Sequence, residues 1–410
     1  MLLHTIKSAL QQGIRGSKPM KNDYWDPVKK RISTRLDYSL ALKNHINFIC
    51  GSDISETRLY NSQFTKFSPT YCIEENPLFL PYKETHHIPK SYFFEHWAYD
   101  KHLNPILIAD HYKPVLKGYK DHSELPVYPF KAVFPSEHMK GNYYYMGMLN
   151  PHYGHFIQEG VTRFWLALKK PSLVNKYTKF VYHVFENFNE QQKNAFLNSN
   201  MMQYLAVLGI NRDNIVFIKK PTTFEHIIIP ESGISISDGN CYLTDEARLV
   251  WLHLNKMMAG YENKNSIVSN KRVYLSRRAV KAPIQGRILL NEDEVESYFR
   301  SIGFEIIVPE DLSQIDMQKA LSTTNFIAGS PGSGLQNSFF IPNPAKTLGI
   351  TCLPIMKINP GINHQVNTDL ICGHKTYGYN TSTNNIFQKN NSIEWKVSIN
   401  NLDKCLATVL

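Results

Sequence analysis

The sequence predicts an α/β protein with two domains, of which the second is Rossmann-like. Its 410 residues exceed the size at which one hydrophobic core stops growing, so two domains of ordinary size are expected. From about residue 179 onward, continuous apolar runs alternate with helical stretches, which is typical of parallel strands covered on both faces. One such run, at 325–328, ends in the Gly/Ser/Pro loop 329–334, the kind of strand–loop–helix junction that binds anions.

The net charge of +10 and the pI near 9.1 favour an acidic partner: nucleic acid, anionic lipid or a phosphorylated small molecule. Because the chain has no recognisable nucleic-acid-binding motif and its basic residues are scattered, we expect no nucleic acid. No apolar run reaches about 18 residues, so no membrane-spanning helix is expected. Six cysteines without a C-x-x-C pair, and an N-terminus without a signal-peptide pattern, favour reduced thiols in a cytoplasmic protein.

Residues 1–21 are basic and amphipathic. Apolar residues recur there at helical spacing among four basic residues and no acidic one. Such a helix could lie on an anionic membrane surface, which would make the protein peripheral at the inner membrane face. The other interpretation is a terminal helix docked on its own domain or on a second subunit.

The following elements are expected in the N-terminal half and the middle of the chain. Short strands are predicted at 47–50 and 105–109, and a helix begins near His155. The alternating region that follows predicts strands at 179–184, 214–218 and 226–230 and helices at 190–208 and 244–258, the last with a cap at Thr244. The polar segment 259–266 is the candidate domain linker.

Four polar residues gather at the start of the helix near His155. Glu159 lies four residues after His155 on the same helical face, Arg163 continues that face, and His152 precedes it. One interpretation is a general base formed by Glu159 or His155, with His152 and Arg163 on the acceptor side. A second is a metal site of His152, His155 and Glu159, although this spacing matches no reliable metal motif. A third is a buried His–Glu pair that only fixes the helix.

The last third has the most regular pattern. Strands are predicted at 272–276, 304–308 and 325–328. One helix follows the cap Asn291, with Glu294 in the capping-box position; a second opens at 313–316, and a third follows the loop 329–334. A βαβαβ unit of this kind binds its ligand at the carboxyl ends of its strands.

Basic side chains and glycines are expected together at that edge of the sheet. Guanidinium groups and bare backbone N–H groups suit a diphosphate, whereas the alternative is a solvated basic face. Neither a G-x-G-x-x-G fingerprint nor a phosphate-binding P-loop is present. The residues concerned are Arg277 and Arg278 at the end of the first strand, Arg287 a little further on, and Gly332, Ser333 and Gly334 after the third.

Several motifs carry a family likeness: Gly154-His155-Phe156-Ile157-Gln158-Glu159, Tyr274-Leu275-Ser276-Arg277-Arg278, Arg287, Asn291-Glu292, Gly303-Phe304-Glu305, Pro309-Glu310, Ser313, Gln318 and Gly329-Ser330-Pro331-Gly332-Ser333-Gly334-Leu335-Gln336-Asn337. Together they resemble glycosyltransferase family 61, which includes bacterial capsule-gene enzymes, plant xylan transferases and animal O-linked GlcNAc transferases. The likeness covers roughly residues 145–355.

The resemblance implies a GT-B architecture, with two Rossmann-like domains facing across a cleft, and inverting transfer from a nucleotide sugar, commonly UDP-linked. It assigns the donor diphosphate to Arg277 and the 332–334 loop and extends the nucleotide site to Pro309, Glu310 and Asn337. One position departs from the family pattern: many members have His where this chain has Pro331. Arg277, Arg278 and backbone N–H groups are then left to carry the phosphate charge.

The chemistry of sugar transfer leads to the same residues. A departing diphosphate is stabilised by Mg²⁺ on carboxylates or by arginine and backbone N–H groups, and the chain offers the second solution, without an assignable D-x-D element. We therefore expect metal-independent chemistry without a cofactor. Inversion needs a base for the acceptor hydroxyl; Glu159 oriented by His155 is slightly favoured over the reverse.

The expected organisation has four parts: a basic extension at 1–40, an acceptor-side Rossmann-like domain at 41–260, a nucleotide-sugar-binding domain at 261–395 and a tail at 396–410 that could form a helix. The expected reaction transfers a sugar to a hydroxyl of a growing surface glycan or lipid-linked acceptor. The alternative is a non-catalytic nucleotide- or phosphate-binding protein with a degenerate GT-B site. The sequence leaves the transferred sugar and the oligomeric state open.

Overall fold

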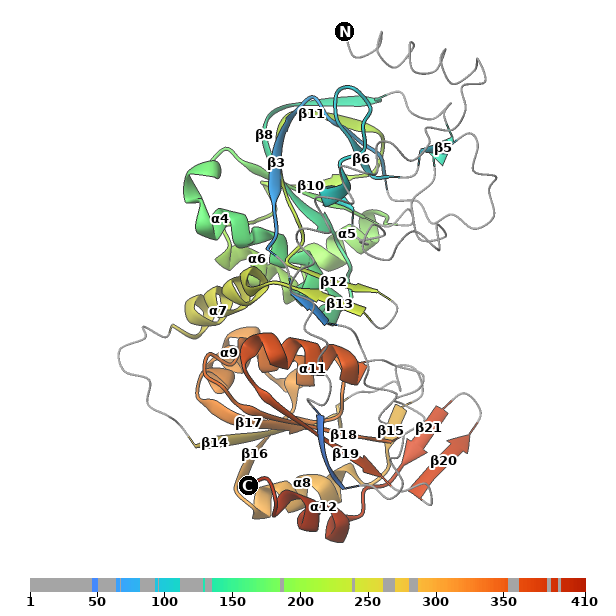
Figure 1. The fold of residues 1–410 in the computed structure, drawn as a ribbon, viewed down its shortest axis with the longest axis vertical. Helices are drawn as coiled ribbons and strands as arrows, with labels where there is room; N and C mark the ends of the chain where they lie inside the picture. Colours follow the sequence, from blue (N-terminus) through green and yellow to red (C-terminus); the bar gives the residue numbers. More distant parts are fainter. Residues whose placement is uncertain are drawn as a thin grey trace. The chain divides into compact units, whose positions relative to one another are not determined.

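The computed structural model describes residues 46–50, 64–66, 68–81, 93–94, 96–110, 128–129, 135–184, 188–237, 240–260, 270–279, 287–352, 361–381, 385–389 and 392–410. These residues form two compact units (Figure 1). The first unit comprises the described residues within 65–237 and 244–250. The second comprises those within 40–64, 238–243 and 251–410. Both units are α/β, which confirms the α/β part of the predicted fold class.

A mixed sheet forms the centre of the first unit, in the order β10-β9-β8-β11-β4-β6, with β3 also paired to β11. Its parallel part consists of β8 (Glu137–Met148), β9 (Lys179–His183), β10 (Ile215–Ile218) and β11 (Thr222–Pro230). The strands β3 (Tyr71–Glu75), β4 (Leu78–Phe79) and β6 (Ala98–Tyr99) are antiparallel to their neighbours. In chain order the parallel strands run 3-2-1-4, as in the first half of a Rossmann sheet, so the order reverses between β8 and β11.

The helical segments of the first unit follow β8 and β9, except for η3, which precedes β8. They are η3 (Leu107–Ala109), α3 (Tyr153–His155), η5 (Phe156–Gly160), η6 (Thr162–Phe164), α4 (Trp165–Lys169), η7 (Pro171–Leu173), α5 (Glu190–Leu197) and α6 (Met201–Val207). The aromatic run Tyr143-Tyr144-Tyr145 of β8 is buried, and Tyr143 and Tyr145 belong to an apolar cluster that includes Val181, Phe224 and Ile227 from the neighbouring strands. This cluster fixes the register of the central strands.

The sequence predictions for this unit are confirmed at β9, β10 and β11, but two of them need correction. The predicted helix at 190–208 is interrupted after Leu197, where the Ser199 hydroxyl donates to the Phe196 carbonyl at 2.6 Å. Serine and asparagine side chains compete with the helical backbone in this way. The predicted strand at 105–109 is a single bridge from Pro105 to Tyr99 followed by the 3₁₀ turn η3, because proline lacks the N–H that a ladder needs.

A six-stranded sheet forms the centre of the second unit, in the order β16-β14-β17-β18-β19-β1, and all its strands are parallel. They are β14 (Lys271–Leu275), β16 (Phe304–Ile307), β17 (Thr324–Gly329), β18 (Lys346–Cys352), β19 (Lys375–Thr381) and β1 (Ile46–Cys50). Without β1 the order is 2-1-3-4-5, as in flavodoxin-like folds. The early strand β1, predicted at 47–50, pairs with β19 of this unit.

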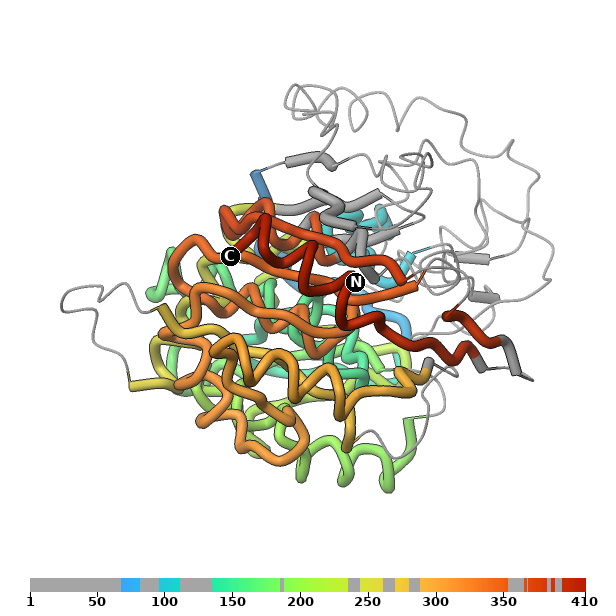
Figure 2. Tube along the Cα trace, turned by 90° about the horizontal axis from the view of Figure 1, so that it is seen from below, coloured from blue at the N-terminus to red at the C-terminus, as the bar shows by residue number. Residues whose placement is uncertain are grey.

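Helices cover both faces of this sheet, with α8 and α12 on one face and α9 and α11 on the other (Figure 1). Figure 2 views the trace from below, so that α8 and α12 lie nearest to the reader. Buried residues of α8 and α12, among them Val295, Phe299 and Leu402, join Phe326 and Leu348 of the sheet in one core. The helical segments of this unit are α8 (Glu292–Ser301), η9 (Pro309–Asp311), α9 (Gln314–Ser322), η10 (Leu335–Phe340), α11 (Gly361–Cys372) and α12 (Ile399–Leu406). The helix α7 (Asp245–Ala259) has residues in both units.

Shorter strands complete the described elements. A small sheet in the second unit has the order β15-β21-β20, formed by β15 (Arg287–Leu289), β21 (Ser392–Trp395) and β20 (Ile386–Lys389). The remaining strands are β2 (Phe64–Lys66), β5 (Phe93–Phe94), β7 (Tyr128–Pro129), β12 (Ile234–Ser237) and β13 (Asn240–Leu243). In the part of the chain that the structure describes, no helix combines the length and apolarity that crossing a membrane requires.

The predicted strands of the last third and the helices α7, α8 and α9 are confirmed, and Thr244 caps α7 as expected. The helix expected to open at 313–316 is α9, and the structure shows Ser313 as its cap. Asn291, however, does not cap α8: its amide accepts from Val397 N–H at 2.9 Å and donates to the Val397 carbonyl at 2.9 Å. It therefore ties the C-terminal segment to the sheet instead. The helix after the glycine loop is the short 3₁₀ element η10. The predicted helix at 1–21 and most of the linker at 259–266 lie outside the described residues.

Candidate functional site

The end of β14 and the end of β17 form the point where the strand order of the second sheet reverses. Leu275 pairs with Gly329, so Ser276 and Ser330 follow on adjacent strands. Parallel sheets of this kind bind ligands in the crevice outside the carboxyl ends of the strands at such a switch point. The predicted Arg277 and the predicted 332–334 loop both lie within a few residues of it.

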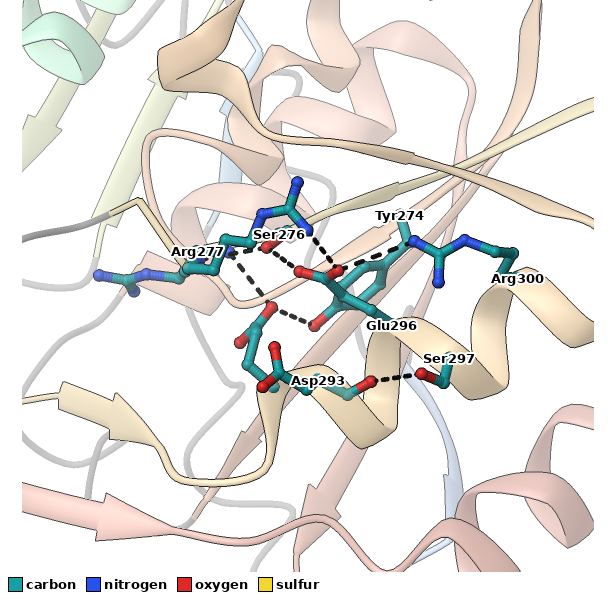
Figure 3. A network of polar contacts seen from close by, with 9 residues as sticks. Tyr274, Ser276, Arg277, Asp293, Glu296, Ser297 and Arg300 are labelled. Atoms are coloured by element: carbon teal, nitrogen blue, oxygen red, sulfur yellow. Dashed lines mark hydrogen bonds and ion pairs between the residues drawn. The ribbon is translucent and has the colours of Figure 1, made fainter.

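A polar network surrounds the end of β14 (Figure 3). The Ser276 hydroxyl donates to Glu296 Oε1 at 2.5 Å, and the Arg278 guanidinium donates to Glu296 Oε2 at 2.9 Å. The backbone N–H of Arg278 also donates to the Ser276 hydroxyl at 3.1 Å. One buried carboxylate on α8 thus binds two polar side chains, those of Ser276 and Arg278, at the end of the strand.

A second carboxylate of the same helix, Glu292, holds the strand one turn earlier. It accepts from the Tyr274 hydroxyl at 2.8 Å and from the Arg277 backbone N–H at 3.2 Å. Burial raises the pKa of the Glu292 carboxyl, and burial likewise raises the pKa of the Tyr274 hydroxyl well above its ordinary value. The two carboxylates are four residues apart on α8 and therefore lie on one face of that helix.

The two predicted arginines have different surroundings. Arg278 is paired with Glu296, whose side chain is 4% exposed, while the Arg278 side chain remains 50% exposed. Among the described residues, no hydrogen bond or ion pair engages the guanidinium of Arg277. In Figure 3 the Arg277 side chain extends away from the Glu296 carboxylate. Of these two arginines, Arg277 is thus the one whose guanidinium has no ion-pair partner among the described residues.

The glycine loop after β17 is shaped by its own residues. Gly332 adopts a φ of +142°, which side chains rarely tolerate, and Gly329 lies so close to β14 that a Cβ would come within 3.1 Å of the Leu275 carbonyl oxygen. Asn337 donates to the carbonyls of Gly334 at 2.9 Å and Ser333 at 3.3 Å. Asn337, predicted to bind nucleotide, therefore braces the loop from within.

Three further predicted residues are spread over separate elements. Pro309 and Glu310 form η9 directly after β16, at the same carboxyl edge of the sheet, and Glu310 is exposed. Arg287 begins β15 in the separate small sheet, where it pairs with Ile393, and its side chain lies outside the described residues. The buried Ser330, which precedes the loop, has a hydroxyl with no described partner.

The first unit carries the second predicted cluster, directly after β8. The chain turns from α3 into the π-helical turn η5, in which Val161 N–H donates to the Phe156 carbonyl at 3.1 Å. π-Turns inside helices are rare and often mark functional positions, because they shift side chains from their α-helical places. This turn contains Glu159 and starts immediately after His155.

His155 and Glu159 form a polar pair across this turn. His155 Nδ1 lies 3.4 Å from Glu159 Oε1, and the side chains are 45% and 9% exposed respectively. The contact with Glu159 raises the pKa of His155, against the opposing effect of partial burial. The exposed His152 ring packs edge-on against His155, with 5.5 Å between centroids. The imidazole of His155 is thus the solvent-accessible member, and Glu159 is the buried one.

Arg163 does not continue this face. It is 2% exposed and its guanidinium donates to main-chain carbonyls, at 2.8 Å to Ile108, 3.1 Å to Asp110 and 3.3 Å to Ala109, as well as to Pro230. The wider π-turn rotates the residues that follow it, which is why the four-residue spacing of the sequence does not carry through to Arg163. Arg163 joins distant segments of the first unit and lies apart from the exposed histidines.

The carboxylates that accept hydrogen bonds from the residues at the end of β14 were not identified from the sequence. Glu296 was not singled out, although its position is readable: it follows Val295 and precedes Phe299 on the buried side of an amphipathic helix. A charged residue on the apolar face of a helix is a signal for a buried polar partner. The described residues contain no group of three or more His, Cys, Asp and Glu side chains that could hold a metal ion.

The family model described as Glycosyltransferase 61 matches residues 153–348, which include both clusters described above. This confirms the resemblance predicted from the sequence motifs. No curated protein is significantly similar to the chain.

Proposed function

We propose that the chain is a glycosyltransferase of family 61, whose model matches residues 153–348, and that it transfers a sugar with inversion from a UDP-linked donor to a hydroxyl of a growing surface glycan. The single observation that carries the donor assignment is the switch point of the second sheet. There an available guanidinium, Arg277, follows β14, and the glycine loop 332–334 follows the adjacent strand β17. A pyrophosphate fits these groups by charge and by hydrogen bonding.

The departing diphosphate needs stabilisation because negative charge develops on it as the sugar–phosphate bond breaks. In this proposal the Arg277 guanidinium donates to the phosphate oxygens, and the backbone N–H groups of the 332–334 loop approach them closely. Gly332 keeps its backbone in a conformation open only to glycine. The arginine and the loop together provide the charge stabilisation, so we propose metal-independent transfer without a cofactor.

The acceptor hydroxyl needs a base on the face opposite the leaving group. The proposal assigns this role to His155, with Glu159 orienting it, because His155 is the solvent-accessible member of the pair and Glu159 is buried. The acceptor oxygen forms a bond to the anomeric carbon, its proton passes to His155 Nε2, and the sugar–phosphate bond breaks to release UDP. This reverses the order of preference drawn from the sequence.

The proposal includes the GT-B arrangement predicted from the sequence, in which the donor and acceptor units face each other across a cleft. Strand orders of Rossmann type in both units support it. A nucleotide sugar and a glycan or lipid-linked acceptor are the proposed partners. The proposed location is cytoplasmic, with peripheral contact to the inner membrane face through residues 1–21.

A donor screen tests the proposal directly. The purified full chain is incubated with a panel of UDP-, GDP-, ADP- and CDP-sugars and the free nucleotide is measured, with and without EDTA. We expect UDP release from at least one UDP-sugar that EDTA does not reduce, and a loss of about 10- to 100-fold in UDP affinity in Arg277→Ala. Arg272→Ala, which alters the opposite end of β14, is the matched control and should bind UDP like the wild type.

The competing function is nucleotide binding without chemistry. It would be supported if the wild type bound UDP in a thermal shift assay but released none from any UDP-sugar, with or without acceptor. A chain that binds no nucleotide diphosphate at all would contradict both functions. EDTA-sensitive release would preserve the transferase and overturn its metal independence.

A further inference from the structure

Arg277 and Arg278 are adjacent in the sequence but differ in electrostatic environment. Arg278 lies 2.9 Å from a carboxylate oxygen of Glu296, and Arg300 Nη2 lies 3.9 Å from the same oxygen. Glu296 is 4% exposed, so this carboxylate is shielded from solvent and its charge acts strongly on its neighbours. The positive charge of Arg278 is therefore largely compensated.

The Ser276 hydroxyl completes this arrangement. It donates to the other oxygen of Glu296 at 2.5 Å and accepts from the Arg278 backbone N–H at 3.1 Å. The carboxylate, the hydroxyl and the guanidinium thus fix the chain as it leaves β14. Arg277 lies between the two fixed residues, and its own backbone N–H is held by Glu292 at 3.2 Å.

These contacts rest on α8, which is anchored independently of any ligand. Val295 and Phe299, on either side of Glu296, are fully buried in the core of the second unit. The Phe299 ring stacks on Tyr274 with 4.5 Å between centroids. Both carboxylates are consequently presented to the end of β14 by a rigid helix, as a preorganised anion site requires.

From this geometry we infer that Arg277 is the anion-binding guanidinium of the site and that Glu296 is a positioning residue, which neutralises Arg278 and locks it together with Ser276. The inference rests on the proposed nucleotide-diphosphate site and sharpens it. Among the described side chains of this edge, Arg277 offers the diphosphate a guanidinium without an ion pair, whereas Arg278 is paired with Glu296. Because Glu296 pairs with Arg278, Arg277 is left to bind the diphosphate.

The experiment compares UDP binding by isothermal titration calorimetry in the wild type, Arg277→Ala, Arg278→Ala, Arg278→Lys and the control Arg272→Ala, at several salt concentrations. Arg277→Ala should weaken UDP binding about 10- to 100-fold and flatten the dependence of log Kd on log salt. Arg278→Ala should weaken it less than about threefold and keep the salt dependence, but should lower the Tm because Glu296 is left buried without its partner. Arg278→Lys should restore the Tm.

Glu296→Gln supplies a readout that structural damage cannot imitate. Glutamine can still accept the Ser276 hydroxyl, but its amide no longer neutralises Arg278. The freed guanidinium should then act as a second cation, so UDP binding should become more strongly dependent on salt than in the wild type. This gain should disappear in the double variant Glu296→Gln/Arg278→Ala.

The outcomes separate the inference from the function beneath it. If the wild type binds UDP but Arg278→Ala weakens binding as much as Arg277→Ala with an unchanged Tm, both arginines are ligands and the inference fails while the proposed function stands. If Glu296→Gln leaves the salt dependence of UDP binding unchanged, Glu296 does not neutralise the charge of Arg278 and the inference fails. If the wild type binds neither UDP nor inorganic pyrophosphate, the donor site itself is refuted.

Discussion

The polar cluster at the end of β14 and the His155–Glu159 cluster after β8 occupy equivalent places in their sheets. They hold their charged groups differently. In the second unit the strand end is fixed by Glu292 and Glu296 on the regular helix α8, and Arg277 remains available. In the first unit His155 and Glu159 sit on the chain that follows β8, and a π-turn sets their geometry. A site that binds a constant anion gains from rigid support, whereas a base must change its protonation state and so needs one accessible member. In the proposed function, charge stabilisation therefore belongs to the cluster of the second unit and proton transfer to the cluster of the first unit.

The largest expected effect separates the two clusters by function. His155→Ala should lower turnover by about 10²- to 10⁴-fold, the usual contribution of a general base, and leave the Kd for UDP within about twofold. Initial rates of UDP release with acceptor, combined with UDP titration, measure the two quantities. If His155→Ala weakens UDP binding as much as it lowers turnover, the two clusters do not have separate functions.

The next effect concerns the support of the first cluster. Gly147 on β8 has a φ of +90°, and a Cβ there would lie 2.7 Å from the Nε atom of buried Arg163. Gly147→Ala should destabilise the protein by about 2–4 kcal/mol, through backbone strain and overpacking together. The matched control is Gly141→Ala on the same strand, where φ is +106° but nothing lies within 4 Å of the added Cβ. Urea unfolding should show a loss of about 1–2 kcal/mol in the free energy of unfolding for the control. Equal losses in the two variants would mean that the Arg163 side chain moves aside at no cost.

A pH profile sharpens the role of Glu159. The contact with Glu159 raises the pKa of His155, and a base must be neutral, so turnover should rise with pH through that raised pKa. Glu159→Gln removes the carboxylate charge and lowers the pKa of His155, and the rising limb of the profile should therefore move to lower pH. An unshifted limb in Glu159→Gln would show that another group titrates there.

The smallest effect tests the glycine loop. Asn337→Ala removes the two hydrogen bonds that brace the carbonyls of Ser333 and Gly334. We expect a loss of about 1 kcal/mol in stability and a few-fold weaker UDP binding, because the loop loses order before it binds. Calorimetry on the variant at one salt concentration measures both. A loss as large as that of Arg277→Ala would instead indicate that Asn337 contacts the nucleotide directly.

Much of the fold could be read from the sequence because its signals are local. Continuous apolar runs predicted β9, β14, β16 and β17, the hydroxyl cap Thr244 placed the start of α7, and the segment 313–316 placed the start of α9. Patterns that depend on distant partners were less informative. Asn291 has the spacing of a cap but bonds to Val397, more than a hundred residues later. The run at 105–109 is apolar enough for a strand, but Pro105 supplies no N–H for a ladder.

By itself, the sequence determined the α/β class, the resemblance to glycosyltransferase family 61 and the residues that end β14 and β17, since these depend on residue type and short-range spacing. Tertiary structure alone decided which of those residues carries an available charge. The difference between Arg277 and Arg278 arises from a buried carboxylate eighteen residues beyond Arg278, on α8, and the difference between His155 and Glu159 arises from burial around a π-turn. Such differences in charge compensation and burial are set by contacts between elements, which residue spacing along a single strand or helix does not encode.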